Sequence, residues 1–90
     1  MKSEPITKHT PGPWDIKFQE NNENWLVMHG LDAVAECPDW NGMPGNANAR
    51  LIAAAPELLE AAKSYLAVIH GDNSPEAIAL RAAISKAEGR

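Results

Sequence analysis

Histidine and cysteine offer the most direct routes to metal binding and acid–base chemistry, and the chain has three histidines and one cysteine. No pair among them has the His-x-x-x-His or Cys-x-x-Cys spacing that holds zinc. The best remaining hypothesis for a cluster is Cys37, Asp39 and His29, converging at one end of a small predicted sheet. A half-buried thiol and a histidine at the end of a strand are, however, ordinary structural uses of these residues. We therefore predict no metal site.

Serines, glycines and carboxylates likewise lack the spacing of a catalytic or phosphate-binding motif. The Gly-x-Ser-x-Gly turn that presents a nucleophilic serine does not occur. Residues 42–45 (GMPG) precede a predicted helix, but no Lys-Ser/Thr pair follows them as in a P-loop. Glu57 and Glu60 share one face of a predicted helix, where such pairs are usually solvated charge. The sequence therefore predicts a protein that is not an enzyme and has no cofactor.

Tryptophan is unusually frequent, with three in a chain that has one Phe and one Tyr. Trp14 and Trp25 lie in predicted strands, and we expect them in the core. Trp40 lies in a loop beside Met43, where it either folds back over the sheet as a lid or stays exposed for a partner. The lid is the favoured interpretation, but loops rich in Trp, Met, Asn and Gly are also typical contact surfaces. The loop at 38–46 is therefore the first interaction hypothesis.

The composition indicates one small globular domain. At 90 residues, with 44% hydrophobic and 22% charged side chains, the chain has room for a thin core that a partner could stabilise. The net charge is -4 and the carboxylates are scattered, so the sequence shows no basic patch that would attract a nucleic acid. A single cysteine excludes an internal disulfide, and no apolar run approaches the roughly 20 residues of a membrane span. We expect a cytoplasmic protein that binds neither membranes nor nucleic acids.

Strand patterns fill the first half of the chain. Residues 14–18 alternate apolar and polar side chains directly after the rigid Pro-Gly-Pro sequence at 11–13. Residues 25–29 form a compact apolar run, typical of a strand buried on much of both faces, and 33–37 form a weaker strand that ends at Pro38. These runs predict a three-stranded antiparallel meander.

Alanine and leucine dominate the second half, which predicts helices. An apolar stripe follows 48–70, with Asn46 or Asn48 as the cap of the first helix. Pro56 must break or kink this stripe, because proline inside a helix costs about 3 kcal/mol. Ser74 is the expected cap of a last helix that starts at the proline after it.

The expected fold is α+β: a small three-stranded antiparallel sheet (meander) over 14–37, followed by two or three helices packed on one face. A loop at 38–46 connects the sheet to the helical part, which we expect at 47–88. Residues 1–10 are expected to be a loose tail, and the whole chain to form a single domain.

Two segments match a known pattern, namely HTPGPW at 9–14 and NANARLIAAAPELLEA at 46–61. They resemble a family of small bacteriophage and prophage proteins that share the signatures HTPGPW and NARLIAAAPELLEA. The resemblance implies a short reading frame of a temperate phage, expressed in the bacterial cytoplasm, and it supplies no catalytic residues. A helix cap and a surface ion pair are the expected uses of Asn48 and Arg50.

We therefore expect a small phage accessory protein that binds a bacterial host or phage protein and inhibits it sterically, with a defence system such as CRISPR as one setting. Its predicted partner-binding residues are Trp40, Met43, Glu36 and Asp39, the acidic pair steering toward a basic surface. One alternative is a structural homo-oligomer of the phage, joined through the alanine-rich faces of the last two helices. A second is a thiol or metal-dependent enzyme built on Cys37 and His29. A sequence-specific DNA-binding protein is the least favoured alternative, because the final helix has few basic residues.

Overall fold

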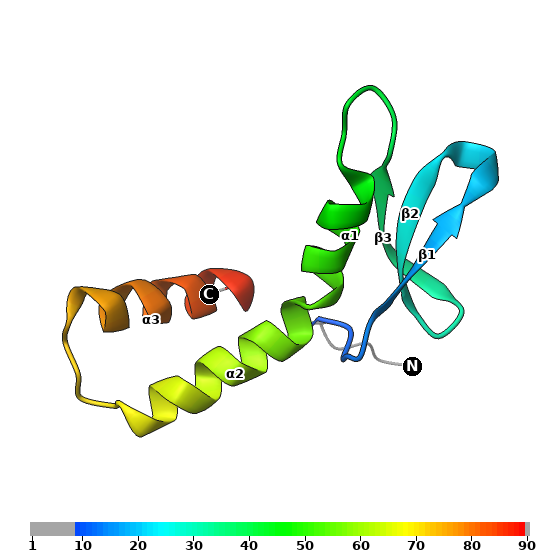
Figure 1. Cartoon of the computed structure of the whole chain (residues 1–90). Helices are drawn as coiled ribbons and strands as arrows, with labels where there is room; N and C mark the ends of the chain where they lie inside the picture. The colour runs from blue at the N-terminus through cyan, green and yellow to red at the C-terminus, as the bar shows by residue number, and fades with distance from the viewer. Residues whose placement is uncertain (1–8, 90) are drawn as a thin grey trace. The chain divides into compact units, whose positions relative to one another are not determined.

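Three strands precede three helices in the computed structural model, which describes residues 9–89 (Figure 1). The strands are β1 (Asp15–Gln19), β2 (Asn24–His29) and β3 (Asp32–Pro38), with a short 3-10 turn, η1 (Glu20–Asn22), after β1. The helices are α1 (Gly45–Ala53), α2 (Ala55–Val68) and α3 (Pro75–Ala87). The expected α+β class is confirmed. The tail expected at 1–10 lies largely outside the described residues.

The strands form one antiparallel sheet in the order β1-β2-β3, so the predicted meander is confirmed, and within residues 9–89 β1 and β3 are its edges. Ile16 of β1 lies opposite Val27 of β2, which in turn lies opposite Ala35 of β3. A bulge between Val27 and Met28 shifts the pairing with β3 by one residue. β2 is buried on both faces, as its apolar run predicts, since consecutive residues Leu26 and Val27 are both buried.

Contacts divide the chain into two compact units. Residues Thr10–Glu57 form the first, which we call the sheet unit; His9 and residues 58–89 are the described part of the second, which we call the helical unit. The boundary falls inside α2. The expectation of a single cooperative domain stays a prediction.

The core of the sheet unit lies between the sheet and α1, which contacts all three strands (Figure 1). Its buried centre consists of Val27, Cys37 and Ala49. Around this centre pack partly buried hydrophobic residues, namely Trp14, Ile16, Trp25, Ala35, Ile52 and Ala53. The prediction that Trp14 and Trp25 belong to the core is therefore confirmed. The sequence predicts two or three helices on the sheet, and in the sheet unit α1 is the helix that covers it.

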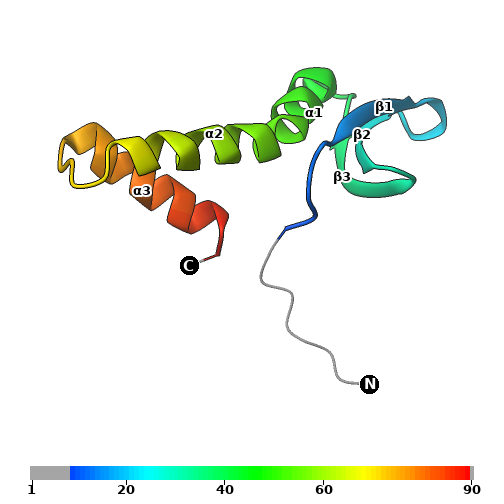
Figure 2. The ribbon, with the colours of Figure 1, turned by 90° about the horizontal axis from the view of Figure 1, so that it is seen from below.

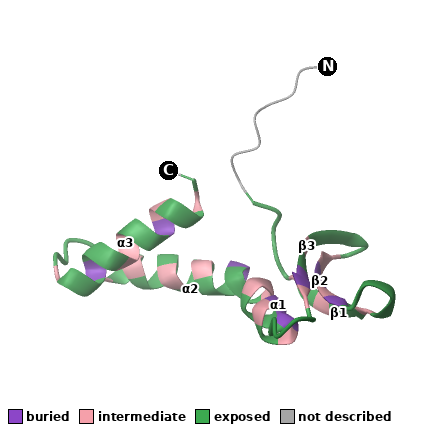
Figure 3. Ribbon diagram, turned by 90° about the horizontal axis from the view of Figure 1, so that it is seen from above, coloured by how far each residue is buried: buried purple, intermediate pink, exposed green. Residues whose placement is uncertain are grey.

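In the helical unit, α3 runs back alongside α2 (Figures 1 and 2). Its buried hydrophobic residues are Ala77 and Ile84 of α3 (Figure 3). The partly buried apolar residues of α2 and the turn after it follow steps of three and four, which places them on one helix face; they are Leu59, Ala62, Leu66 and Ile69. An ion pair of 2.7 Å joins Lys63 Nζ to Glu88 Oε2.

The helix boundaries confirm two sequence predictions. Helical geometry stops at Ala54, and α2 starts again with Pro56 in its first turn, where a missing amide hydrogen costs little. Ser74 caps α3, because its hydroxyl oxygen accepts a hydrogen bond of 3.1 Å from the amide of Ala77. Both residues therefore act as their sequence context predicts.

The start of α1 differs from the prediction. The helix begins at Gly45 after Pro44, and neither Asn46 nor Asn48 caps it. Asn46 lies inside the first turn instead, and its Oδ1 accepts a hydrogen bond of 2.8 Å from Nε of Arg50. The cap prediction was wrong because the amide of Gly45, at the start of the helix, donates its hydrogen bond to Oδ1 of Asp39 in the preceding loop.

Candidate protein-binding surfaces

The loop between β3 and α1 contains a tight turn closed by Trp40 and Met43. The amide of Met43 donates a hydrogen bond of 3.0 Å to the carbonyl of Trp40. Between them Asn41 and Gly42 both have positive φ, 59° and 80°. This is the geometry of a type I′ β-turn, for which Asn-Gly is a favoured sequence. The Cα atoms of residues at the two ends of such a turn lie within about 7 Å, so Trp40 and Met43 are neighbours.

Hydrogen bonds also connect the residues at the base of the same loop. The amide of Gly45 donates to Oδ1 of Asp39 at 3.0 Å and to the carbonyl of Met43 at 2.9 Å. Pro44, between them, has φ and ψ of -83° and 71°, the values of an inverse γ-turn. The amide of Asp39 in turn donates to the carbonyl of Glu23 at 3.1 Å, which ties the loop to the β1–β2 hairpin. Hydrogen bonds therefore hold both the turn and the base of this loop.

Gly45 is required where the loop meets α1. It is buried, and a Cβ atom on it would lie 2.9 Å from the carbonyl oxygen of Cys37 and closer still to that of Pro38. Real Cβ atoms do not approach backbone oxygens this closely. The end of β3 and the start of α1 can therefore meet only because residue 45 has no side chain.

Trp40 and Met43 are 50% and 47% exposed, and neither belongs to the core cluster. The favoured prediction of a lid over the sheet is therefore wrong. The Asn41–Gly42 turn folds the loop back on itself within two residues and leaves both side chains about half exposed. The alternative prediction, an exposed aromatic residue available to a partner, agrees with this exposure.

The predicted steering residues Glu36 and Asp39 are exposed, and each also has a structural partner. Oε1 of Glu36 accepts a hydrogen bond of 3.2 Å from the side-chain amide of the buried Asn24. Oδ1 of Asp39 accepts the hydrogen bond from the Gly45 amide. Exposed Glu20 and Glu23 lie on the adjoining β1–β2 hairpin. This end of the sheet therefore carries several carboxylates around the turn, and their role toward a partner stays a prediction.

The structure separates the cluster proposed around Cys37. Cys37 lies opposite Trp25 at one end of β2, whereas His29 lies opposite Asp32 at the other end. Trp25 and His29 are four residue steps apart along β2, about 13 Å, so the hypothesis that Cys37 and His29 converge is wrong. Cys37 is a buried free thiol in the core. Within residues 9–89, no three His, Cys, Asp or Glu side chains gather closely enough to hold a metal ion.

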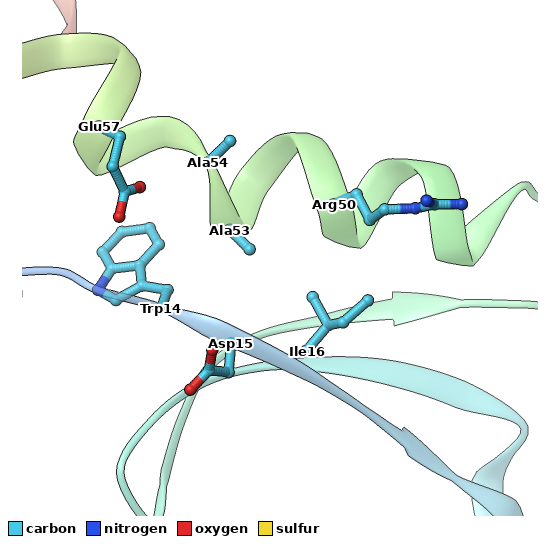
Figure 4. A pocket seen from close by; sticks show the side chains of 7 residues that line it. All are labelled: Trp14, Asp15, Ile16, Arg50, Ala53, Ala54 and Glu57. Atoms are coloured by element: carbon cyan, nitrogen blue, oxygen red, sulfur yellow. The ribbon is translucent and has the colours of Figure 1, made fainter. Parts of the chain in front are cut away.

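A second surface feature, absent from the sequence predictions, is a hollow of about 390 Å³ between the start of β1 and α1 (Figure 4). Its lining comes from two segments of the sheet unit, residues Trp14, Asp15 and Ile16 on one side and Arg50, Ala53, Ala54 and Glu57 on the other. Gly12 lies against Pro56 nearby, where a Cβ on the glycine would be 2.9 Å from the proline Cβ. The indole nitrogen of Trp14 donates to the carbonyl of Pro11 at 3.0 Å.

The two segments that carry the family resemblance meet at this hollow. Trp14 belongs to HTPGPW, and the helix residues belong to NARLIAAAPELLEA. The sequence predicts a helix cap and a surface ion pair for Asn48 and Arg50 of the second segment, and assigns neither segment to a binding site. A signal for the hollow was nevertheless present, because Arg50, the two alanines and Glu57 follow the i, i+3, i+4, i+7 spacing of one helix face.

A family model described as Salmonella phage P22 protein Y8K6 matches residues 1–90. The chain belongs to this family. The expected membership of a small phage protein family is thus confirmed, while the sharing of the two motifs within the Y8K6 family stays a prediction. Comparison with curated proteins found no match. Comparison with solved structures found none either.

Among the described residues of this Y8K6 family protein, no helix combines the length and apolar character that a membrane crossing requires.

Proposed function

We propose that this phage protein acts by binding a protein of the bacterial host or of the phage, through the turn at Trp40–Met43. One observation carries the proposal: two large apolar side chains, each about half exposed, stand at the two ends of a hydrogen-bonded turn. Aromatic side chains are frequent binding hot spots. A loop held by its own hydrogen bonds also loses less conformational freedom when it binds.

The partner surface that suits this turn is an apolar pocket with a basic rim. Trp40 and Met43 would fill the pocket, while the carboxylates of Glu36 and Asp39 face basic groups and speed the encounter. No catalytic step is involved, and inhibition follows from steric occlusion of the partner. A component of a defence system such as CRISPR is one specific case of this proposal.

Replacing Trp40 tests the proposal. Trp40→Ala should weaken binding by about 2 kcal/mol or more, which is roughly 30-fold in Kd. It should leave the melting temperature nearly unchanged, because Trp40 lies outside the core cluster. The wild-type protein, immobilised, would capture the partner from infected cells for identification by mass spectrometry. Titration calorimetry with the purified partner then gives Kd for each variant.

Leu31→Ala is the matched control, because Leu31 is another apolar residue at a loop tip and is 97% exposed. It should bind like the wild type. The proposal fails if Trp40→Ala binds with unchanged Kd, or if it lowers stability as much as a core substitution would.

A second candidate function, a structural homo-oligomer, is favoured by one face of α2 in the helical unit. Four exposed apolar residues follow each other there in steps of three and four, namely Leu58, Ala61, Tyr65 and Val68. An apolar stripe with this spacing is typical of helices that pair. Sedimentation equilibrium at micromolar concentration should then show an oligomer that Tyr65→Glu dissociates, whereas a monomeric wild-type protein excludes this candidate.

A further inference from the structure

One corner of the sheet unit holds a glutamate in a backbone conformation that glutamate rarely adopts. Glu23, in the turn between β1 and β2, has a φ of 50° and lies in the left-handed region. A residue with a Cβ atom is strained there, because the Cβ comes close to the carbonyl oxygen that follows it. The other described non-glycine residue with a positive φ is Asn41, and asparagine tolerates this region. Glu23 therefore carries backbone strain that a glycine at this position would not.

The side chain of Glu23 does not repay this strain inside the molecule. It is exposed, and its carboxylate makes no hydrogen bond or ion pair within residues 9–89. The carbonyl of Glu23 accepts a hydrogen bond of 3.1 Å from the amide of Asp39, and its amide donates to the carbonyl of Glu20 at 3.3 Å. Both bonds use main-chain atoms, which a glycine would also supply. The folded structure therefore gives no reason for a glutamate at position 23.

The next residue, Asn24, also has an unmet requirement. Asn24 is 5% exposed, and its Nδ2 donates to Oε1 of Glu36 at 3.2 Å. Its Oδ1 is buried and has no hydrogen-bond partner among the described residues. Buried acceptors without a partner are rare in folded proteins and lower stability. Two consecutive residues thus reduce stability at one corner, and departures of this kind concentrate at functional sites.

This corner adjoins the turn proposed above as a binding surface. The hydrogen bond from the Asp39 amide to the Glu23 carbonyl places Glu23 beside the residue that precedes Trp40. The loop that holds each of them lies at the same end of the sheet unit (Figure 1). Glu23 is therefore at the rim of a surface whose centre is the exposed pair of Trp40 and Met43. Interfaces have this arrangement of an apolar centre and a polar rim.

We propose that Glu23 is a specificity-determining residue of this binding surface, and that its carboxylate forms an ion pair with a Lys or Arg side chain of the partner protein. The inference rests on the function proposed above and names a contact that this function does not itself require. The strained backbone persists because the side chain that it carries is used in binding.

Replacing Glu23 by a residue that suits positive φ should change stability and binding in opposite directions. Glu23→Gly should raise the denaturant midpoint of unfolding, because glycine adopts positive φ without strain. Glu23→Asn, which keeps a side chain and tolerates positive φ, should also raise it. Both variants should bind more weakly to the purified partner that the wild-type protein captures, because neither has the carboxylate. Midpoints that stay the same or fall in both variants would overturn the proposal, since no strain would then be relieved.

Glu23→Gln separates the charge from the strain. This variant keeps the Cβ atom, so the denaturant midpoint should not move. Its association rate constant with the same partner, measured by surface plasmon resonance, should fall roughly fivefold at low salt, and the difference should shrink as salt screens the charge. Glu20→Gln, at an exposed glutamate that starts η1, is the matched control for net charge and should bind like the wild type. Equal association rates of the two variants would overturn the proposal.

The role of Glu23 and the function proposed for the turn fail separately. If Trp40→Ala leaves Kd unchanged, the turn is not the binding surface, and the proposed function fails. If Trp40→Ala weakens binding but Glu23→Gln does not, the turn binds its partner without an ion pair at Glu23, and the role of Glu23 alone is wrong.

Discussion

The sheet unit and the helical unit differ in how completely they bury apolar side chains. In the sheet unit, one sheet face and α1 enclose a cluster centred on the fully buried Val27. In the helical unit the buried hydrophobic residues are Ala77 and Ile84, while Tyr65 and Val68 remain 59% and 77% exposed. A helix can cover much of a small sheet, but two helices cover only a stripe of each other. The sheet unit therefore has an enclosed core and the helical unit buries only a stripe, although both expose large apolar side chains, such as Trp40 in the sheet unit and Val68 in the helical unit.

The two units also differ in how closely other atoms approach their glycine residues. In the sheet unit, Gly12 packs against Pro56, and Gly45 packs against the end of β3, at distances that leave no room for a side chain. In the helical unit, Gly71 has open space around it and serves a turn with a φ of 88°. Close backbone packing is thus a property of the sheet unit, and we expect its stability to depend on such contacts.

The largest expected effect is that of Gly45→Ala. The added methyl group would meet the carbonyls of Cys37 and Pro38, and we expect a loss of about 3 kcal/mol in the free energy of unfolding. Tryptophan fluorescence during denaturant unfolding measures it, because all three tryptophans lie in the sheet unit. Ala47→Ser, which adds one atom at an exposed position of α1, is the control. A loss below about 1 kcal/mol would show that the contact relaxes easily.

A smaller effect is expected for Ser74→Ala. The substitution removes the side-chain oxygen that accepts the Ala77 amide, and loss of such a cap costs about 1 kcal/mol. Helical circular dichroism should report an earlier transition, while tryptophan fluorescence should be unchanged. If both signals move together, the two units unfold as one cooperative domain, as the sequence predicts, and the contrast between them does not extend to stability.

Much of the fold was predictable because its signals are local. The alternation at 14–18 predicts β1, Pro56 predicts the end of α1, and Ser74 predicts the start of α3. Each signal acts within a few residues along the chain, through side-chain spacing, a missing amide hydrogen or a capping oxygen. These features could be derived without knowing which elements pack together.

The candidate sites were harder to predict because they depend on register and on distant contacts. Cys37 and His29 both lie near strand ends, but only the pairing of β2 with β3 shows that the ends are opposite ones. The hollow exists because Trp14 and Glu57, far apart in sequence, face the same space. The turn at Asn41–Gly42 did have a local signal, since Asn-Gly favours a type I′ turn.

The smallest effect should come from the ion pair between Lys63 and Glu88. Its atoms lie 2.7 Å apart, but the Lys63 side chain is 43% exposed, and exposed pairs contribute from about 0.2 to 1 kcal/mol. Glu88→Gln should therefore lower the stability of the helical unit by less than about 0.5 kcal/mol, and the loss should vanish at high salt. Glu60→Gln, at a glutamate that is exposed, is the control for net charge. A loss of about 1 kcal/mol or more would mean that a thin unit depends on its surface pairs, and would sharpen the contrast with the enclosed core of the sheet unit.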